Sequence, residues 1–357
     1  MDLLIDLYTD FLIACPGQIT STLLSEVLDN QVGHDKFTRL LSSGKINSKY
    51  LWHEVKPMCQ EIECDDAVLI LDDSVEAKPY TKCNNLIRYH YDHTVGKSVK
   101  GVNFITAIYN SWEMSLPVGV DFVIKDQSYI DKDGKTKYKS KVSKNEMYRE
   151  LIARAGSQLR FRYVLNDSWF ASAENMAFIN EKMDRYFIMA IKENRKVALS
   201  KEDKLAGKYI SIKEASMEEC VRSVYIEQLD FPILITKQVF KNGDGSTGTL
   251  YLSGNDLSLT YQQMTTIYQR RWKVEEYHKS IKSNTAFPKS PTSTVLSQRS
   301  HFIASILSNV KLERLKIRHS KNHFALKALL LKNATVSAWN KLNSLDINRN
   351  HPVNKAA

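Results

Sequence analysis

The chain opens with a helical rhythm of hydrophobic positions. In the first 62 residues, apolar side chains recur at helical spacing, as at Leu3, Leu7 and Phe11. Pro16 and Gly17 then interrupt the run, so the pattern predicts several short helices. A bundle of this kind suits a DNA-binding helix-turn-helix and a packing or dimerisation unit equally well, and no recognition helix is evident.

From residue 67 the hydrophobic pattern changes from helical spacing to short apolar runs. Ala67 to Leu71 is continuously apolar, which predicts a buried strand. Further strands are predicted at residues 102–110, 116–124, 161–166 and 186–191, and helices at residues 143–155 and 171–183. This order, three strands followed by alternating helices and strands, predicts an antiparallel opening to a mixed α/β sheet flanked by helices.

The rest of the chain begins with a β-like stretch and returns to helix. Residues 193–256 contain several short runs typical of strands. Thr260 followed by Gln263 forms a capping box, and neither Pro nor Gly interrupts residues 261–284, which predicts one long helix. A second long helix is predicted at residues 295–317.

Composition narrows the class of protein. The 357 residues are 43% hydrophobic and 25% charged, which is ordinary for a globular protein of two or three folding units. The net charge of +10 indicates a polyanionic partner, either nucleic acid or an anionic membrane surface. No apolar run approaches the roughly 20 residues that cross a bilayer, so nucleic acid is favoured. The five cysteines lack metal-type spacing and are typical of reduced thiols in the cytoplasm.

Acidic residues stand at the ends of two predicted strands. Asp72 and Asp73 directly follow the apolar run that ends at Leu71, and Asp167 follows the strand that ends at Asn166. A carboxylate at the end of a buried strand is costly unless it is paired or bound to a metal ion. These aspartates are therefore candidates for a functional site.

The helix predicted at residues 261–284 carries a further candidate group. Tyr268, Arg271, Glu275 and Lys282 fall within an arc of about 60° on its surface, beside an apolar stripe. A carboxylate between Arg and Lys at the edge of a core suits a metal site that faces a polyanion. The same pattern also suits a solvated helix face with ordinary charge pairs.

The spacing Tyr268-x2-Arg271-x3-Glu275-x6-Lys282 resembles the Y-R-E-K signature of DDE transposases from bacterial insertion sequences. The positions of the acidic residues agree, since the ribonuclease-H-like fold of that family carries them on its first strand, its fourth strand and its last helix. The resemblance covers about residues 66–320 and implies that Tyr268, Arg271 and Lys282 contact phosphates at the transposon ends.

By the same resemblance, Asp72, Asp167 and Glu275 form the catalytic triad that binds metal. Asp73 is the alternative first aspartate, because Ser74 permits either alignment. Carboxylates are hard oxygen ligands that suit Mg²⁺ or Mn²⁺, and two such ions about 3.5–4 Å apart can activate the attacking oxygen and stabilise the leaving one.

The domain organisation follows from the pattern and the resemblance together. We expect an N-terminal helical segment for DNA binding or dimerisation, a ribonuclease-H-like catalytic core in two parts, an all-β insertion, and a C-terminal helix end with a polar tail. In that order these units span residues 1–62, 63–192 with 257–335, 193–256, and 336–357.

These features predict a DNA transposase that cleaves transposon ends and transfers the strand into target DNA. The alternatives are a hydrolytic nuclease of the same fold and a catalytically inactive basic DNA-binding protein. The expected partner is double-stranded DNA, both transposon ends and target, bound by a homodimer. No membrane role is expected, and the predicted location is the bacterial cytoplasm in association with the nucleoid.

Other candidate residues have less specific surroundings. The Lys-rich residues 126–144 predict an exposed loop that could follow phosphates, and the His-rich residues 90–93 predict a surface or DNA contact ahead of a metal site. Glu276 lies outside the helix face that carries Tyr268, so we expect it to face solvent or to form an ion pair. We expect Trp272 and Tyr277 to pack inside the protein, and the alternative is that they stack on a flipped base of the DNA.

Overall fold

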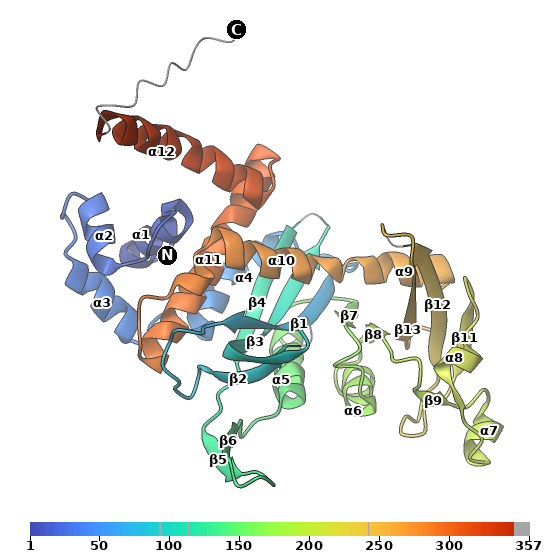
Figure 1. Ribbon diagram of the computed structural model, residues 1–357. Helices are drawn as coiled ribbons and strands as arrows, with labels where there is room; N and C mark the ends of the chain where they lie inside the picture. Colours follow the sequence, from blue (N-terminus) through green and yellow to red (C-terminus); the bar gives the residue numbers. More distant parts are fainter. Residues whose placement is uncertain (93–94, 113, 242, 346–357) are drawn as a thin grey trace.

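A computed structural model describes residues 1–92, 95–112, 114–241 and 243–345. Its centre is a large mixed sheet in the order β11-β12-β13-β8-β7-β1-β3-β2, with β4 also paired to β3 (Figure 1). The strands are β1 (Val68–Ala77), β2 (Arg88–Asp92), β3 (Lys97–Ser111), β4 (Met114–Phe122), β7 (Tyr163–Asn166), β8 (Tyr186–Ala190), β11 (Val221–Val224), β12 (Ile233–Lys241) and β13 (Thr247–Gly254). The predicted mixed α/β fold is confirmed.

Helices surround this sheet. The longer ones are α1 (Leu3–Ala14), α2 (Ser21–Val27), α3 (His34–Ser42), α4 (Ser48–Glu61), α5 (Lys144–Gly156), α9 (Tyr261–Gln269), α10 (Trp272–Asn284), α11 (Val295–His319) and α12 (His323–Leu345). A shorter helix, α6 (Ala173–Ala177), continues into a π-helical turn (Phe178–Lys182). In the described part of the chain, no helix has the length and apolar character that crossing a membrane requires.

β1 is the central element of the sheet. It pairs antiparallel with β3 and parallel with β7, and its first residues, Val68 to Leu71, are completely buried. Successive residues of a strand point to opposite faces. Asp72 and Ser74 therefore face α10, whereas Asp73 faces α5, and these two helices lie on opposite sides of the sheet (Figure 1).

The N-terminal residues form short helices, as the hydrophobic pattern predicts, and pack against α11 (Figure 1). Buried polar contacts fix this packing: the Tyr8 hydroxyl lies 2.9 Å from Nδ1 of His301, and the Ser308 hydroxyl donates to the Thr9 carbonyl at 3.0 Å. The role of this segment in DNA binding or dimerisation stays a prediction.

The helix predicted at residues 261–284 begins at the predicted capping box but is broken in two. The prediction of one helix is wrong, because α9 ends at Gln269 and α10 begins at Trp272. The Arg270 guanidinium donates to the side chain and the carbonyl of Asn110 at 2.8 and 2.7 Å, and to the Asp66 carbonyl at 2.7 Å. These bonds hold the junction of the two helices against the sheet, while Arg270 and Arg271 themselves keep helical dihedral angles.

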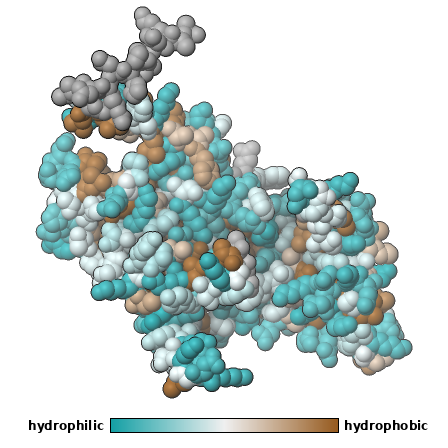
Figure 2. Space-filling view, viewed as in Figure 1, coloured by the Kyte–Doolittle hydropathy of each residue, from teal (hydrophilic) through white to brown (hydrophobic). Residues whose placement is uncertain are grey.

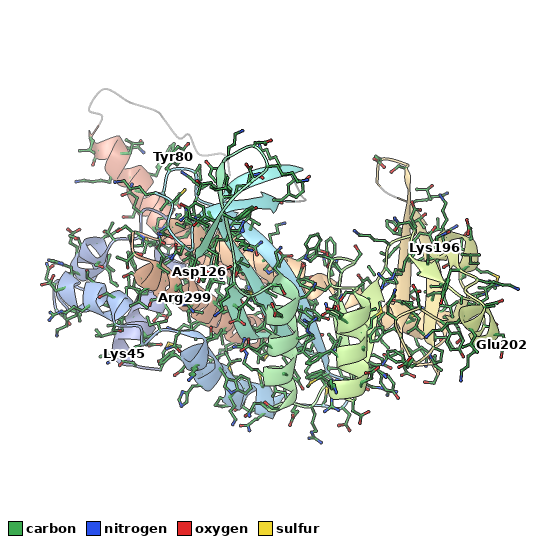
Figure 3. The ribbon with its side chains drawn as sticks, turned by 90° about the horizontal axis from the view of Figure 1, so that it is seen from below. Lys45, Tyr80, Asp126, Lys196, Glu202 and Arg299 are labelled. Carbon is green, nitrogen blue, oxygen red and sulfur yellow. The ribbon has the colours of Figure 1, made fainter. Side chains whose placement is uncertain are left out.

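Residues 193–256 differ from the predicted all-β insertion in two ways. They include the short helices α7 (Lys201–Leu205) and α8 (Ile212–Ala215) beside the small strand pair β9 (Lys196–Val197) and β10 (Ile210–Ser211). Their strands β11 to β13 extend the central sheet through pairing of β13 with β8. This region lies at the opposite end of the molecule from the N-terminal helices, as the labels Glu202 and Lys45 show in Figure 3.

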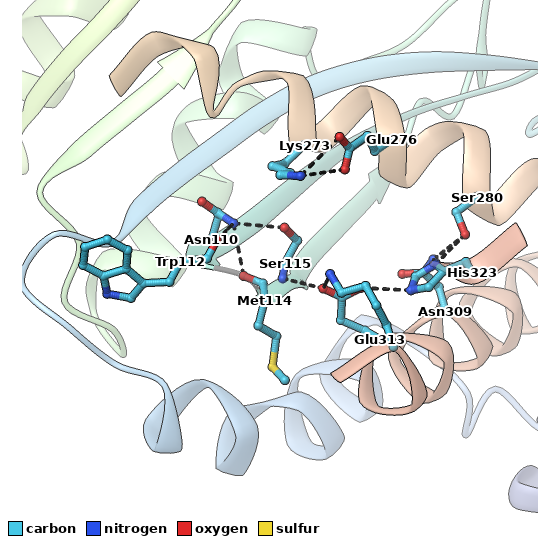
Figure 4. A network of polar contacts seen from close by, with 11 residues as sticks. Asn110, Trp112, Met114, Ser115, Lys273, Glu276, Ser280, Asn309, Glu313 and His323 are labelled. Carbon is cyan, nitrogen blue, oxygen red and sulfur yellow. Dashed lines mark hydrogen bonds and ion pairs between the residues drawn. The ribbon is translucent and has the colours of Figure 1, made fainter. Parts of the chain in front are cut away.

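The C-terminal helices are joined to the sheet by a buried carboxylate. Glu313 of α11 accepts from the Ser115 amide at 2.9 Å, lies 2.9 Å from Nε2 of His323 at the start of α12, and pairs with Lys316 (Figure 4). The other ring nitrogen of His323 lies 2.7 Å from the Ser280 hydroxyl of α10. One network therefore links β4, α10, α11 and α12. The polar tail predicted from residue 346 lies outside the described residues.

Gly101 of β3 provides a test of the pairing that supports Asp72 and Asp73. A Cβ atom at this position would lie 2.1 Å from the Glu76 carbonyl oxygen of β1. Because that neighbour is backbone and cannot move aside, we expect Gly101→Ala to lower the free energy of unfolding by about 1–3 kcal/mol. Urea denaturation measures the change. Gly17→Ala is the matched control, since a methyl group added there would meet no atom within 4 Å, and an equal loss in both variants would contradict the prediction.

The contacts of Glu313 should make the stability of the fold sensitive to acid. Burial alone would raise the pKa of Glu313, but the His323 ring, the Lys316 ammonium and the Ser115 amide lower it below its ordinary value of 4.5. A carboxyl whose pKa is lower in the folded state stabilises the fold above the unfolded pKa and loses that contribution as pH falls. We expect Glu313→Gln to cost about 1–3 kcal/mol at pH 7 and to unfold with a shallower dependence on pH below about 4.5.

Thermal unfolding monitored by circular dichroism between pH 3 and pH 7 checks this expectation. Glu276→Gln is the control, because Glu276 is half-exposed and its pair with Lys273 lies on the surface. Parallel pH profiles for wild type and Glu313→Gln would show that the buried carboxylate does not carry the acid sensitivity.

Candidate active site

Two aspartates lie together on neighbouring parallel strands. Asp167 directly follows β7, whereas Asp72 lies in the middle of β1, because that strand continues to Ala77 instead of ending at the apolar run as predicted. The register of β1 and β7 aligns Ile70 with Leu165, so that two residues further on Asp72 and Asp167 stand at the same level. The structure therefore brings together the first two acidic residues that the sequence singled out. The Asp167 carboxylate also accepts from the Trp169 amide at 2.9 Å, which orients it in the loop after β7.

The environment of these aspartates is electrostatically unfavourable for two negative charges. Burial, together with the Asp167 carboxylate, raises the pKa of Asp72 to about 8, although the Arg271 guanidinium opposes the rise. Burial likewise raises the pKa of Asp167, against the Trp169 amide and Arg271, which lower it. A pocket of this kind favours a bound cation, because a positive charge would stabilise both ionised carboxylates.

Arg271 connects Glu275 to the site of the two aspartates. It lies at the junction of α9 and α10, where its guanidinium pairs with Glu275 and lies 4.0 Å from Asp72. Arg270 points the other way, to Asn110. The two adjacent arginines thus have different partners. Arg270 fixes the helix junction, and Arg271 lies between the carboxylates of Glu275 and Asp72.

Asp73 has a different set of partners. Its carboxylate pairs with the Lys144 ammonium at 2.6 Å and accepts from the Asn103 side-chain amide at 2.9 Å. These groups lie on the α5 side of the sheet, away from Arg271 and Glu275. The geometry therefore favours Asp72 over Asp73 as the partner of Glu275, although the charge of Asp73 also raises the pKa of Asp167.

The remaining residues of the Y-R-E-K pattern are held by protein groups in this structure. Tyr268 is buried, and its hydroxyl donates to the Asn166 carbonyl at 3.3 Å, next to Asp167. The Lys282 ammonium donates to the Ser74 hydroxyl at 2.9 Å and to the Val75 carbonyl at 3.0 Å. Both side chains thus lie beside the segments that carry Asp72 and Asp167, as the shared helix face predicts.

Sequence reasoning missed several residues that build the site. Asn166 is completely buried, accepts from the Tyr148 hydroxyl at 2.6 Å and donates to the Asp167 carbonyl at 2.7 Å. Asn103 and Lys144 hold Asp73, and Arg270 holds the helix junction. Asn103, Lys144 and Arg270 have their partners on distant segments, whereas Asn166 bonds its chain neighbour and Tyr148 of α5. The only local signal was the capping box formed by Ser143 and Glu146, which places the start of α5 beside Lys144.

The other candidates divide between surface and core. Glu276 pairs with Lys273 and Tyr277 is buried, which confirms both predictions. Trp272 is 60% exposed, so the prediction that it packs in the interior is wrong. Residue His90 belongs to strand β2 and is buried, whereas His93 lies outside the described residues.

The donor groups at the site suit a hard divalent cation. Asp72, Asp167 and Glu275 all offer carboxylate oxygens, which Mg²⁺ and Mn²⁺ prefer. Within the ranges that the structure describes, no three histidine, cysteine, aspartate or glutamate side chains are close enough to hold a metal ion. The Arg271 guanidinium stands between Asp72 and Glu275 instead. The role of the three carboxylates as metal ligands therefore stays a prediction.

A mixed sheet flanked by helices, with one aspartate on β1 and another directly after β7, agrees with a ribonuclease-H-like fold. Comparison with protein families points to the same class. A family model described as "DDE superfamily endonuclease" matches residues 4–209, and a model described as "Transposase DDE domain" matches residues 135–310. A search of curated proteins found no match.

The first of these models matches more than half of the chain. The chain therefore belongs to the DDE superfamily of endonucleases and is a DDE transposase, an enzyme that acts on the phosphodiester bonds of DNA. Its substrate is DNA, and divalent metal ions are typical of its family.

The choice between the two adjacent aspartates of β1 can be tested directly. Asp72→Asn and Asp73→Asn remove the same charge from neighbouring positions. Because Asp72 lies beside Arg271 and Asp73 is held by Lys144, we expect Asp72→Asn to lower the cleavage rate by at least about 1000-fold, a loss of about 4 kcal/mol of transition-state stabilisation. We expect Asp73→Asn to retain measurable cleavage. A supercoiled plasmid nicking assay measures both rates, and the reverse ranking would assign the first position to Asp73.

Proposed function

We propose that this transposase belongs to the Y-R-E-K group and acts on the ends of its own insertion sequence. In this proposal, Asp72, Asp167 and Glu275 hold Mg²⁺ or Mn²⁺, in a site for two ions. The enzyme cleaves the DNA at the transposon ends and joins the freed 3′ ends to target DNA. The bound ions would supply the activation of the attacking oxygen and the stabilisation of the leaving one.

The observation that carries the proposal is the pair of partly buried aspartates at one level of β1 and β7, with Arg271 as the neighbouring positive charge. Two desolvated carboxylates side by side are costly, and a site that keeps them has a use for a cation. Glu275 completes the set, because α10 brings it within reach of the same arginine.

Arg271 has a second role in this proposal. When cations bind the carboxylates, its guanidinium is released from Asp72 and Glu275 and can bind a DNA phosphate through two parallel hydrogen bonds. Lys282 can exchange its bonds to Ser74 and Val75 for a phosphate oxygen in the same way. Tyr268 is buried in the free protein, so its contact with DNA requires a local adjustment of α9.

The active assembly in this proposal is a homodimer on two transposon ends, working in the bacterial cytoplasm in association with the nucleoid. The support is the resemblance in the Y-R-E-K residues and the net charge of +10, which favours a polyanionic partner.

Glu275→Gln tests the proposal at its most specific residue. The change keeps the side-chain volume and removes the charge, so the helix should persist while metal-dependent cleavage falls by several orders of magnitude. Each 1.36 kcal/mol of lost transition-state stabilisation lowers the rate about tenfold. DNA binding should be unchanged or tighter, because a negative charge that faces the phosphates has been removed.

Glu276→Gln is the matched control, since Glu276 pairs with Lys273 on the exposed side of the same helix. Cleavage by this variant should stay within a few-fold of wild type. A dead Glu276→Gln with an active Glu275→Gln would show that the signature match is accidental. Activity in both would show that α10 does not carry the chemistry. A joined DNA product in the wild-type reaction separates a transposase from a hydrolytic nuclease.

A further inference from the structure

The Lys-rich segment at residues 126–144 is a hairpin and not the predicted loop. Strands β5 (Gln127–Ile130) and β6 (Thr136–Lys139) pair antiparallel with each other and form a sheet separate from the central one. Every residue of both strands is exposed, and the hairpin projects from the body of the molecule (Figure 1). A free two-stranded hairpin is at best marginally stable in water, so burial of apolar surface does not explain its presence.

Local bonds shape the tip of this hairpin. The Asp131 carboxylate accepts from the amides of Asp133 and Lys135 at 3.0 and 2.8 Å, and it pairs with Lys137 at 2.7 Å. Gly134 supplies the left-handed backbone that the turn requires, with a φ of 73°. The turn is thus held by residues of the hairpin itself, the Lys137 ammonium among them.

The two faces of the hairpin differ. On one face the Arg88 guanidinium of β2 stacks on the Tyr138 ring at 3.6 Å, which ties that face to the body of the protein. The other face pairs Tyr129 with Lys137 and Gln127 with Lys139 across the strands. It therefore presents the Lys139 ammonium, the Gln127 amide and the Tyr129 ring in one exposed patch, beside the Lys137 ammonium that pairs with Asp131.

The charge and composition of this patch indicate which kind of partner it binds. Residues 126–144 contain six lysines and three aspartates, and the projecting lobe is largely hydrophilic in the space-filling view (Figure 2). A basic surface with interspersed polar and aromatic groups suits a polyanion that also has a base edge to contact. A two-stranded ribbon has the width that the major groove of B-DNA admits, about 12 Å.

The base of the hairpin lies beside the candidate active site. Lys144, at the start of α5, pairs with Asp73, the neighbour of Asp72. On the other arm, the Lys125 ammonium donates to the Tyr89 carbonyl of β2 at 2.6 Å. The hairpin therefore projects from a point one residue along β1 from Asp72, on the other face of the sheet.

We propose that DNA bound at Asp72 extends past the edge of the sheet to the α5 side, where the β5–β6 hairpin enters the major groove of the duplex that adjoins the cleaved phosphate. The inference rests on the proposed function in one respect, namely that DNA is held and cut at Asp72. From Lys135 to Lys144 the backbone spans at most about 30 Å at roughly 3.3 Å per residue. At about 3.4 Å per base pair, the contacts therefore fall within roughly one helical turn of the cleaved phosphate.

Three variants of the full-length protein test this proposal. The double variant Lys137→Gln/Lys139→Gln neutralises the patch, and a second variant replaces residues 127–139 with two glycines. The two arms are hydrogen-bonded at Gln127 and Lys139, so a short turn can close the gap, and unfolding temperatures should match that of wild type. Lys201→Gln/Lys208→Gln removes the same charge at the far end of the molecule and is the matched control.

The probe is a fluorescein-labelled duplex of the DNA that flanks the gene. Its affinity is measured against salt concentration by anisotropy. Loss of two phosphate contacts should lower the slope of log K against log salt by about 2 for Lys137→Gln/Lys139→Gln, with a much smaller change in the control. Methylation of guanine N7, which lies in the major groove, should interfere with binding of wild type within one turn of the cleavage position. The shortened variant should lose that interference.

An unchanged salt slope and an unchanged interference pattern in the hairpin variants would overturn the proposal. Competition by a minor-groove ligand such as distamycin, without N7 interference, would also overturn it, because the hairpin would then lie in the wrong groove. Failure of the proposed function has a separate signature. Wild type would then show no metal-dependent cleavage, while the dependence of DNA binding on the hairpin could be measured all the same.

Discussion

The constraint on which this structure depends is the repulsion between two partly buried carboxylates. Asp72 and Asp167 lie at one level of two parallel strands, and burial and mutual charge together raise the pKa of Asp72. Arg271 offsets part of this cost by standing between Asp72 and Glu275. A protein that served stability alone would not keep these groups inside. Here the sheet holds them in place, and a phosphodiester-cleaving enzyme needs such a concentration of negative charge to attract divalent ions.

The position of Arg271 depends in turn on its neighbour. Arg270 binds Asn110 and the Asp66 carbonyl, and it thereby fixes the junction between α9 and α10 against the sheet. An uninterrupted helix would place the two arginines about 100° apart on one straight axis. Both residues keep helical dihedral angles here, and each guanidinium has its own partner. At the other end of the same region, the Glu313 network joins α10 to α11 and α12, so the helix that carries Glu275 is held at both ends.

The two faces of β1 carry different groups. On the α10 side lie Asp72 and the groups of the Y-R-E-K pattern, which form the candidate active site. On the α5 side Asp73 is neutralised by Lys144, which stands at the base of the basic hairpin. Alternation along a single strand thus connects the chemical site to a surface suited to hold DNA. The positive charge of the chain is not spread evenly in this arrangement, since the hairpin places much of it close to the acidic pocket.

The sequence by itself determined the features that depend on neighbouring residues. The apolar run before Asp72, the capping boxes at Ser143 and Thr260, and the mixed order of strands and helices were all readable, because periodicity and caps are local. Only the tertiary structure decided the break at Arg270, whose partner Asn110 is 160 residues away. It also decided that β13 joins the central sheet and that Trp272 is exposed. Pairing between distant segments leaves no periodic signal, because the hydrogen bonds and packing that fix it form only when the chain has folded.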